Sequence, residues 1–158
     1  MDSLQQARQK IADLIAQDAV REALRYLNGL TAYRFTGVYR FGKDQVTNRV
    51  FYDREHPDVL SMQDIPIEAT YCSFMRHSRG PFLLADSLRD ERLASHCARE
   101  EVRSYCGVPL VDDQGWMHGS LCHFDFEPHP LRETDLMLLQ AIAPLLVPQA
   151  AGRLAANA

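Results

Sequence analysis

Residues 103–125 read RSYCGVPLVDDQGWMHGSLCHFD, and this stretch decides the fold that we expect. Two mostly apolar segments, 105–111 and 117–126, lie on either side of Asp-Asp-Gln-Gly at residues 112–115. Aspartate and glycine between two apolar runs are a strong signal for a turn. The stretch therefore predicts a β-hairpin, and with it an antiparallel sheet.

The alternation of apolar and polar residues predicts further strands upstream. Strand patterns lie at residues 33–41 and 46–53, which a Gly-Lys-Asp turn joins, and a short apolar strand is expected at 82–85. Five segments are expected to be helical: residues 3–17, 19–30, 69–77, 90–102 and a last one that follows Pro130. The first two are compatible with one long kinked helix. Residues 54–66 are polar and contain two prolines, so we expect a loop there.

Hairpins combined with separate helices predict an α+β domain built on a central antiparallel sheet of about five to six strands. No repeat, low-complexity tract or linker divides the chain. We expect a helical segment at residues 1–30 that is part of the same domain, the body of the domain at 31–150, and a flexible tail at 151–158. Pro144 and Pro148 each remove a helix hydrogen bond and are expected to interrupt the last helix.

The composition is that of an ordinary soluble domain, with 158 residues, a net charge of −4, 46% apolar residues and 24% charged residues. No basic run suits nucleic acid or an anionic membrane, so neither is an expected partner. The first residues, MDSLQQARQK, do not form a signal peptide, and we expect a cytoplasmic protein. In that reducing compartment Cys72, Cys97, Cys106 and Cys122 should be free thiols.

Three local signatures within residues 65–146 resemble the GAF family, in particular the branch often found ahead of diguanylate cyclases and sensor kinases. They are Ile65-Pro66 with Thr70-Tyr71-Cys72, then PFLLAD at 81–86 with DERL at 90–93, then RSYCGVPL at 103–110 with GSLCHFD at 119–125. Their order and spacing also agree with the family. The resemblance implies a GAF-type, PAS-like fold, with the terminal helices on one face of the sheet and shorter pocket-forming helices on the other.

The resemblance also implies a small-molecule pocket beside the inner helices. Cys106 and His123 stand where the family usually has alanine and valine, and we expect these exchanges to tune the pocket. The full set of candidate ligand-binding residues is Phe41, Tyr71, Cys72, Phe74, Asp86, His96, Cys97, Tyr105, Cys106, His123 and Asp125. Core packing is the alternative for the aromatic residues. For the two aspartates the alternative is a structural role, in which they accept hydrogen bonds from turn amides.

Other chemistries fit the sequence less well than a small-molecule pocket. The histidines and cysteines do not have metal-ligand spacing, so no metal is expected. The bilin-attachment and cyclic-nucleotide motifs of GAF relatives are both missing from the sequence. Cys72 and Cys97 lie roughly where the free methionine sulfoxide reductases of this superfamily carry cysteines, although the Gly-rich surroundings of that class are absent. A cysteine-dependent reductase of free methionine sulfoxide is therefore the enzymatic alternative.

Together these patterns favour a stand-alone GAF sensory module, which is not an enzyme and has no catalytic residues. It would bind an unidentified small molecule and signal through contacts in a homodimer or with a separate effector protein. A structural dimerisation module with a filled pocket is the third alternative. The sequence does not indicate whether a cofactor binds or which one it would be.

Overall fold

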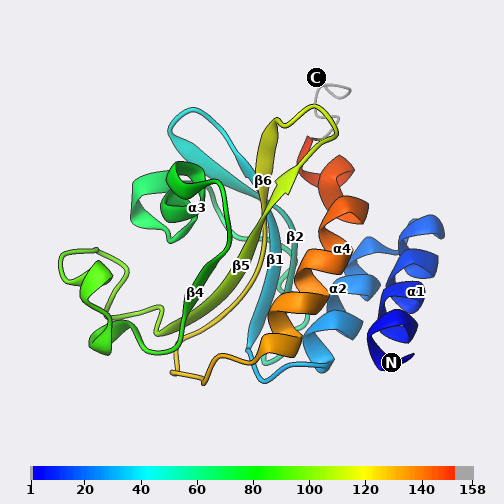
Figure 1. Ribbon diagram of the computed structural model, residues 1–158, viewed down its shortest axis with the longest axis horizontal. Helices are drawn as coiled ribbons and strands as arrows, with labels where there is room; N and C mark the ends of the chain where they lie inside the picture. The colour runs from blue at the N-terminus through cyan, green and yellow to red at the C-terminus, as the bar shows by residue number, and fades with distance from the viewer. Residues whose placement is uncertain (1, 152–158) are drawn as a thin grey trace.

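The computed structural model describes residues 2–151, in which a curled sheet carries helices on both faces (Figure 1). Within that range six strands lie in the order β3-β2-β1-β6-β5-β4, and each neighbouring pair is antiparallel. The strands are β1 (Phe35–Phe41), β2 (Gln45–Asp53), β3 (Ile65–Pro66), β4 (Phe82–Leu84), β5 (Ser104–Val111) and β6 (Met117–Asp125). The predicted α+β architecture is confirmed.

The β5–β6 hairpin turns at Asp112. Its carboxylate oxygen Oδ1 accepts hydrogen bonds from the backbone N–H groups of Gln114 at 2.9 Å and Trp116 at 3.0 Å. Gly115 completes the turn with a φ of 88°, a conformation that other residues rarely adopt. The hairpin predicted from residues 112–115 is therefore confirmed.

Helices α2 (Val20–Gly29) and α4 (Glu133–Ala151) cover one face of the sheet, and α1 (Asp2–Ala16) packs on the outer side of these two helices (Figure 1). Asp18, between α1 and α2, has a φ of 62°, which lies outside the helical region. The first two helices are therefore separate elements and not one kinked helix. Both contribute buried side chains to the same core as the sheet and α4.

Helix α4 runs through Pro144 and Pro148, so the predicted interruption is wrong. Leu139, Ile142 and Leu146 are fully buried against the sheet, and this packing offsets the hydrogen bond that each proline forfeits. By length and composition alone α4 could cross a membrane. Its buried apolar residues belong to the same core as the sheet, α1 and α2.

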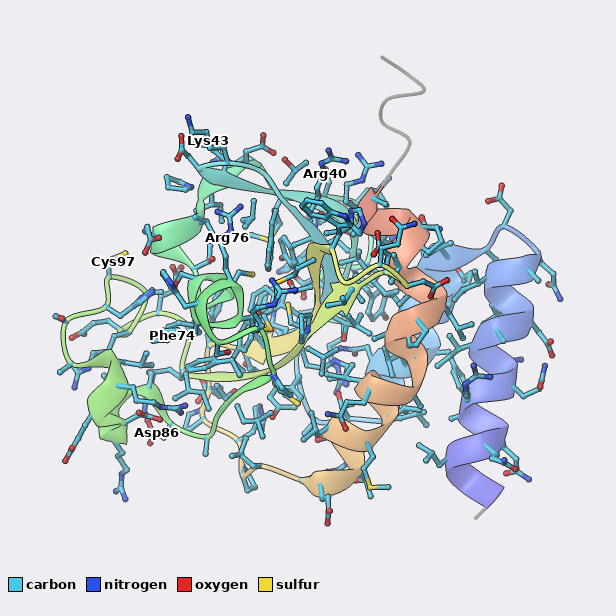
Figure 2. All side chains as sticks on the ribbon, turned by 45° about the horizontal axis from the view of Figure 1, so that its top comes forward. Arg40, Lys43, Phe74, Arg76, Asp86 and Cys97 are labelled. Atoms are coloured by element: carbon cyan, nitrogen blue, oxygen red, sulfur yellow. The ribbon has the colours of Figure 1, made fainter. Side chains whose placement is uncertain are left out.

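The C-terminal end of α4 is held by the β1–β2 hairpin. Arg40 donates a hydrogen bond to the carbonyl oxygen of Ala151 at 2.8 Å, and Arg49 donates one to that of Gln149 at 3.1 Å. Figure 2 shows Arg40 beside this end of the helix. The arginines thereby satisfy carbonyl groups that have no partner inside the helix. Of the predicted tail, 151–158, all but Ala151 lies outside the described residues.

The other face carries the short helix α3 (Cys72–Ser78) and the 3-10 turns η1 (Ile67–Ala69), η2 (Ser87–Arg89) and η3 (Glu91–Leu93). A helix over 90–102 was predicted, and that prediction is wrong, because beyond η3 the segment is a series of turns. Asp90 accepts a hydrogen bond from the N–H of Arg92 at 3.0 Å, and His96 accepts one from that of Ala98 at 3.0 Å. Such side-chain bonds to nearby backbone compete with helix formation.

Candidate functional site

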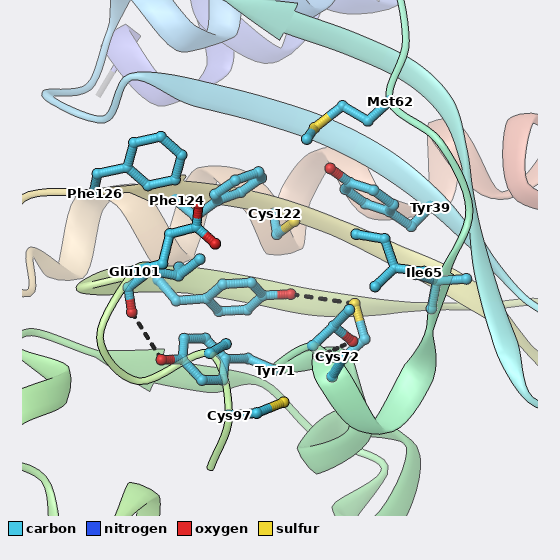
Figure 3. Close-up of a pocket in the computed structure, with 16 residues that line it drawn as sticks. Tyr39, Met62, Ile65, Tyr71, Cys72, Cys97, Glu101, Cys122, Phe124 and Phe126 are labelled. Carbon is cyan, nitrogen blue, oxygen red and sulfur yellow. Dashed lines mark hydrogen bonds between the residues drawn. The ribbon is translucent and has the colours of Figure 1, made fainter.

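A cavity of about 340 Å³ opens between the sheet and the α3 side of the molecule (Figure 3). Its volume lies within the range of roughly 300–1,000 Å³ that is typical of small-molecule sites. Strands β1, β2, β5 and β6 form its floor, while α3, Met62 of the loop after β2 and residues 97–102 form its walls. Most of the lining is apolar, and five aromatic rings contribute to it: Tyr39, Tyr71, Tyr105, Phe124 and Phe126.

Two glycines shape the floor of the cavity. A Cβ atom at Gly37 would stand 2.8 Å from Cε1 of Tyr39, and one at Gly107 would stand 2.6 Å from Cε1 of Tyr105. Residues two apart on a strand share a face, so each tyrosine ring lies along its own strand and covers the glycine. A side chain at either glycine would push the ring away. The two glycines therefore let the rings lie low and leave room above them.

A thiol and two hydroxyl groups meet at the α3 end of the floor. The Sγ of Cys72 lies 3.6 Å from the hydroxyl of Tyr105 and 3.5 Å from the Oγ of Ser120. Burial raises the pKa of Cys72, and it raises that of Cys122 well above the ordinary thiol value. Burial likewise raises the pKa of Tyr105 well above its usual value. These groups are therefore neutral near pH 7.

Two side-chain hydrogen bonds join residues 96–102 to the residues directly before α3. The Nε2 of His96 lies 3.2 Å from the carbonyl oxygen of Thr70, and the hydroxyl of Tyr71 donates to the carbonyl of Val102 at 2.7 Å. The His96 ring also stacks on Phe74 with centroids 5.7 Å apart. Cys97 follows His96 directly and is exposed at the edge of the cavity. Among the described residues, His, Cys, Asp and Glu form no group of three that could hold a metal ion.

The sequence model of the GAF domain matches residues 12–147. The chain belongs to the GAF domain family. Solved GAF structures share its fold at low sequence identity. The GAF domain of an Acinetobacter phosphoenolpyruvate-protein phosphotransferase has a TM-score of 0.75 at 13% identity, over 96% of this chain and 94% of that one. A putative GAF sensor protein from Burkholderia vietnamiensis has a TM-score of 0.66 at 17% identity, over 94% and 92%.

Similar proteins also include enzymes. The free methionine-R-sulfoxide reductase of Neisseria meningitidis, solved with its substrate, has a TM-score of 0.72 at 20% identity, over 94% of this chain and 89% of that one. In sequence, a cyclic di-GMP phosphodiesterase of Pseudomonas aeruginosa is 32% identical over 92 residues. The match covers 56% of this chain but 16% of that protein, so this GAF domain corresponds to a small part of its relative.

The predicted site residues divide by position around the GAF cavity. Four of them line it: Tyr71, Cys72, Cys97 and Tyr105. Phe74 and His96 stand behind the wall, where Phe74 stacks on the ring of Phe82 with centroids 4.5 Å apart. Phe41 is outside the lining and packs under the guanidinium of Arg76, 5.8 Å from its ring centroid.

Cys106 and His123 lie on the opposite face of the sheet, and their expected position in the pocket is wrong. They are paired across β5 and β6, and Cys106 belongs to the core beneath α1, α2 and α4. His123 stacks on the ring of Tyr33 at 5.5 Å, and its Nδ1 lies 2.7 Å from the hydroxyl oxygen of Thr36. The physical reason is the strand period of two, which places each residue next to a pocket-facing neighbour on the far side.

Asp86 and Asp125 also lie away from the cavity lining, and both bond to turn amides as the structural alternative anticipated. Asp86 accepts from the N–H of Leu88 at 3.1 Å and from Arg103 at 2.7 Å. Asp125 accepts from the N–H of Glu127 at 3.0 Å. These bonds fix the ends of β4 and β6.

Several residues that line the cavity were not predicted from the sequence, notably Tyr39, Glu101, Cys122 and Phe124. The hairpin register pairs Tyr105 with Phe124, and directly paired residues point to the same face. Since Tyr105 was a candidate, alternation along the second strand could have added Phe124 and then Cys122. Glu101 carried no such signal, because it lies in the segment that was expected to be a surface helix.

Proposed function

We propose that this GAF domain is a sensory module that binds a small molecule in the cavity between the sheet and α3. The observation that carries the proposal is the cavity itself, which has the volume and the mostly apolar lining of a ligand site. The hydroxyl of Tyr39 points into it and offers a polar anchor (Figure 3). A structural dimerisation module with a filled pocket would not need this empty volume.

A path of direct contacts links the cavity to the C-terminal end of α4. Tyr39 forms part of the floor, and the next residue on β1, Arg40, holds the last carbonyl of α4. On the pocket side, Arg76 of α3 donates to the carbonyl of Lys43 in the β1–β2 turn at 2.9 Å and also to that of Gly42. A ligand that favours one position of this hairpin would therefore bias the position of the α4 end.

The output of the module is a change in contacts with a second copy of the chain or with a separate effector protein in the cytoplasm. Large apolar side chains suited to such a contact are exposed at the end of α2 and around the start of α4, namely Leu30, Leu131 and Met137. Among the relatives, a putative sensor protein and a cyclic di-GMP phosphodiesterase carry similar domains, which supports a role in signal transduction.

The sensory proposal is tested by filling the cavity. Ala98 lines the pocket, so Ala98→Phe should remove most of the space and abolish ligand retention. Ala94 lies in the same segment but is exposed, and Ala94→Phe is the matched control. We expect native mass spectrometry of gently purified protein to show a retained mass in the wild type and in Ala94→Phe, but not in Ala98→Phe. Bound ligand should also slow hydrogen exchange of the backbone amides at the C-terminal end of α4 in the wild type and in Ala94→Phe.

If all three proteins lack a retained mass, and extracts of the host change hydrogen exchange equally in all of them, the cavity has no sensory role. Equal retention by Ala98→Phe and the wild type would place the ligand elsewhere. Either result would contradict the proposal.

The second candidate is a reductase of free methionine sulfoxide, which one observation favours: Cys72, Cys97 and Cys122 all line the same cavity. Reduction would convert the sulfoxide to the thioether and water while two thiols form a disulfide. The raised pKa values of Cys72 and Cys122, caused by burial, oppose this chemistry because the thiolate is the reactive form. Incubation with free methionine sulfoxide and dithiothreitol should therefore leave the substrate unchanged. Turnover that Cys97→Ser removes would establish the enzyme instead.

A further inference from the structure

The described part of the cavity lining carries negative charge and no positive charge. Glu101 is the one charged side chain of its lining within the described residues, and no lysine, arginine or histidine contributes there. Its carboxylate lies on the side of Phe124 and Phe126 (Figure 3). Its neighbour Glu100 forms an ion pair with Arg99 at 3.9 Å. Glu101 forms no ion pair with another described residue, so its carboxylate is available to a ligand.

The deeply buried thiols and phenols of the lining do not carry charge. Burial keeps Cys72, Cys122, Tyr39 and Tyr105 in their neutral forms, because it raises the pKa of each. An anionic ligand would lose its hydration and meet no positively charged side chain of the described lining, which is costly in an apolar cavity. The nearby Arg34 guanidinium, 5.5 Å from the Phe126 ring centroid, is already paired with Asp53 and Glu55. Phosphate esters and carboxylates are therefore a poor match for this site.

The aromatic walls suit a positive charge instead. The faces of tyrosine and phenylalanine rings attract cations, and ammonium groups are commonly held between such rings. Five rings line this cavity, and Phe124 and Phe126 stand on the side where Glu101 ends (Figure 3). Because the Arg34 guanidinium already lies over the Phe126 ring, the Glu101 carboxylate and the Phe124 ring are the groups that can hold one ammonium group. The rest of the cavity accepts an apolar body.

We propose that the ligand of this pocket is an organic cation, namely an amine. Its ammonium group would lie between the carboxylate of Glu101 and the ring of Phe124, and its apolar body would cover the rings of Tyr39 and Tyr105. The inference rests on the sensory function proposed above and narrows its ligand to one chemical class. It assigns Glu101 as the residue that determines specificity for charge.

The test uses three probes of nearly equal size: 2-phenylethylamine as the cation, 2-phenylethanol as the neutral analogue and phenylacetate as the anion. Binding is measured by saturation-transfer NMR and by the shift of the melting temperature at low ionic strength. We expect the amine to bind at least about tenfold more tightly than phenylacetate, with the alcohol between them. Added salt should weaken binding of the amine more than binding of the alcohol.

Paired variants identify the residue responsible. Glu101→Gln should weaken binding of 2-phenylethylamine about fivefold and leave binding of 2-phenylethanol nearly unchanged, because only the ion pair is lost. Glu100→Gln removes the same charge one residue away, outside the cavity lining, and should bind all three probes as the wild type does. Equal losses in the two variants would reveal a diffuse surface effect and overturn the assignment of Glu101.

The outcomes separate this inference from the sensory function. Equal or tighter binding of the alcohol or of phenylacetate would overturn the cationic class while showing that the cavity binds small molecules. Binding of none of the probes at millimolar concentration also overturns the class. The sensory function falls only if, in addition, the wild type and Ala98→Phe behave alike in the ligand-retention experiment.

Discussion

Replacing Gly119 by alanine should lower the free energy of unfolding by at least about 3 kcal/mol, which is a large part of the stability of a domain of this size. A Cβ atom at this position would stand 1.8 Å from the carbonyl oxygen of Tyr39 and 3.1 Å from the Cα of Arg40. Both are backbone atoms of β1, which lies between β2 and β6 inside the sheet. Neither strand can move aside without breaking its ladder, so the clash cannot be relieved cheaply.

Urea unfolding followed by circular dichroism measures this effect. Gly29→Ala is the matched control, because a Cβ at Gly29 has no atom within 4 Å and the residue ends helix α2. The control should unfold at the same urea concentration as the wild type or slightly above it, since alanine favours helix. A Gly119→Ala protein within about 1 kcal/mol of the wild type would show that β1 and β6 can separate enough at Tyr39 to admit a Cβ atom.

The fold was largely predictable because its signals are local. The turn at residues 112–115 sets the β5–β6 hairpin, and the alternation of apolar residues sets the other long strands. The error at 90–102 has a physical cause that a helical pattern does not display. The side chains of Asp90 and His96 accept hydrogen bonds from nearby backbone N–H groups. The resulting turns pack against α3 and form a wall of the cavity.

The last helix shows the limit of local rules in the opposite direction. Pro144 and Pro148 predict an interruption, yet the helix continues through both. Burial of Leu139 and Leu146 against the sheet supplies a stabilisation that depends on residues distant in sequence. Local propensity cannot include that contribution, because it exists only once the sheet has formed.

The site was harder to predict than the fold, because a strand presents two faces and the sequence does not say which one meets the pocket. Cys122 and His123 are adjacent, but Cys122 lines the cavity while His123 is buried on the other face. Choosing His123 selected the wrong face of the strand. The pairing of Tyr105 with Phe124 would have decided the question, since it places one face of both strands beside α3.

The buried position of His123 leads to the second large expected effect, a loss of stability in mild acid. Burial, with a contribution from the positive charge of Arg54, lowers the pKa of His123 to about 3. The side chain is fully buried, and within the described residues its Nε2 has no hydrogen-bond partner, so a proton there would not be compensated. The unfolded chain binds that proton near the ordinary histidine pKa of about 6.5.

The sign follows from the difference between the two states. Below about pH 6.5 the unfolded state binds a proton at His123 that the folded state does not bind. The stability that is present at neutral pH is therefore lost as the pH falls towards 3. Between pH 7 and pH 5 the loss from this one residue should be about 2 kcal/mol. Other groups also titrate in this range, so the effect is isolated by comparison with a variant.

His123→Val is the informative variant, because valine suits a buried strand position and does not titrate. Urea unfolding at pH 7 and at pH 5 should show that the wild type loses about 2 kcal/mol more than this variant over the interval. His77→Gln changes an exposed histidine and should keep the pH dependence of the wild type. If His123→Val and the wild type lose the same stability between the two pH values, the folded protein must accommodate a charged His123. In that case the core beneath α2 and α4 would have to admit water or an acceptor for its proton, because an uncompensated charge there would be too costly to bury.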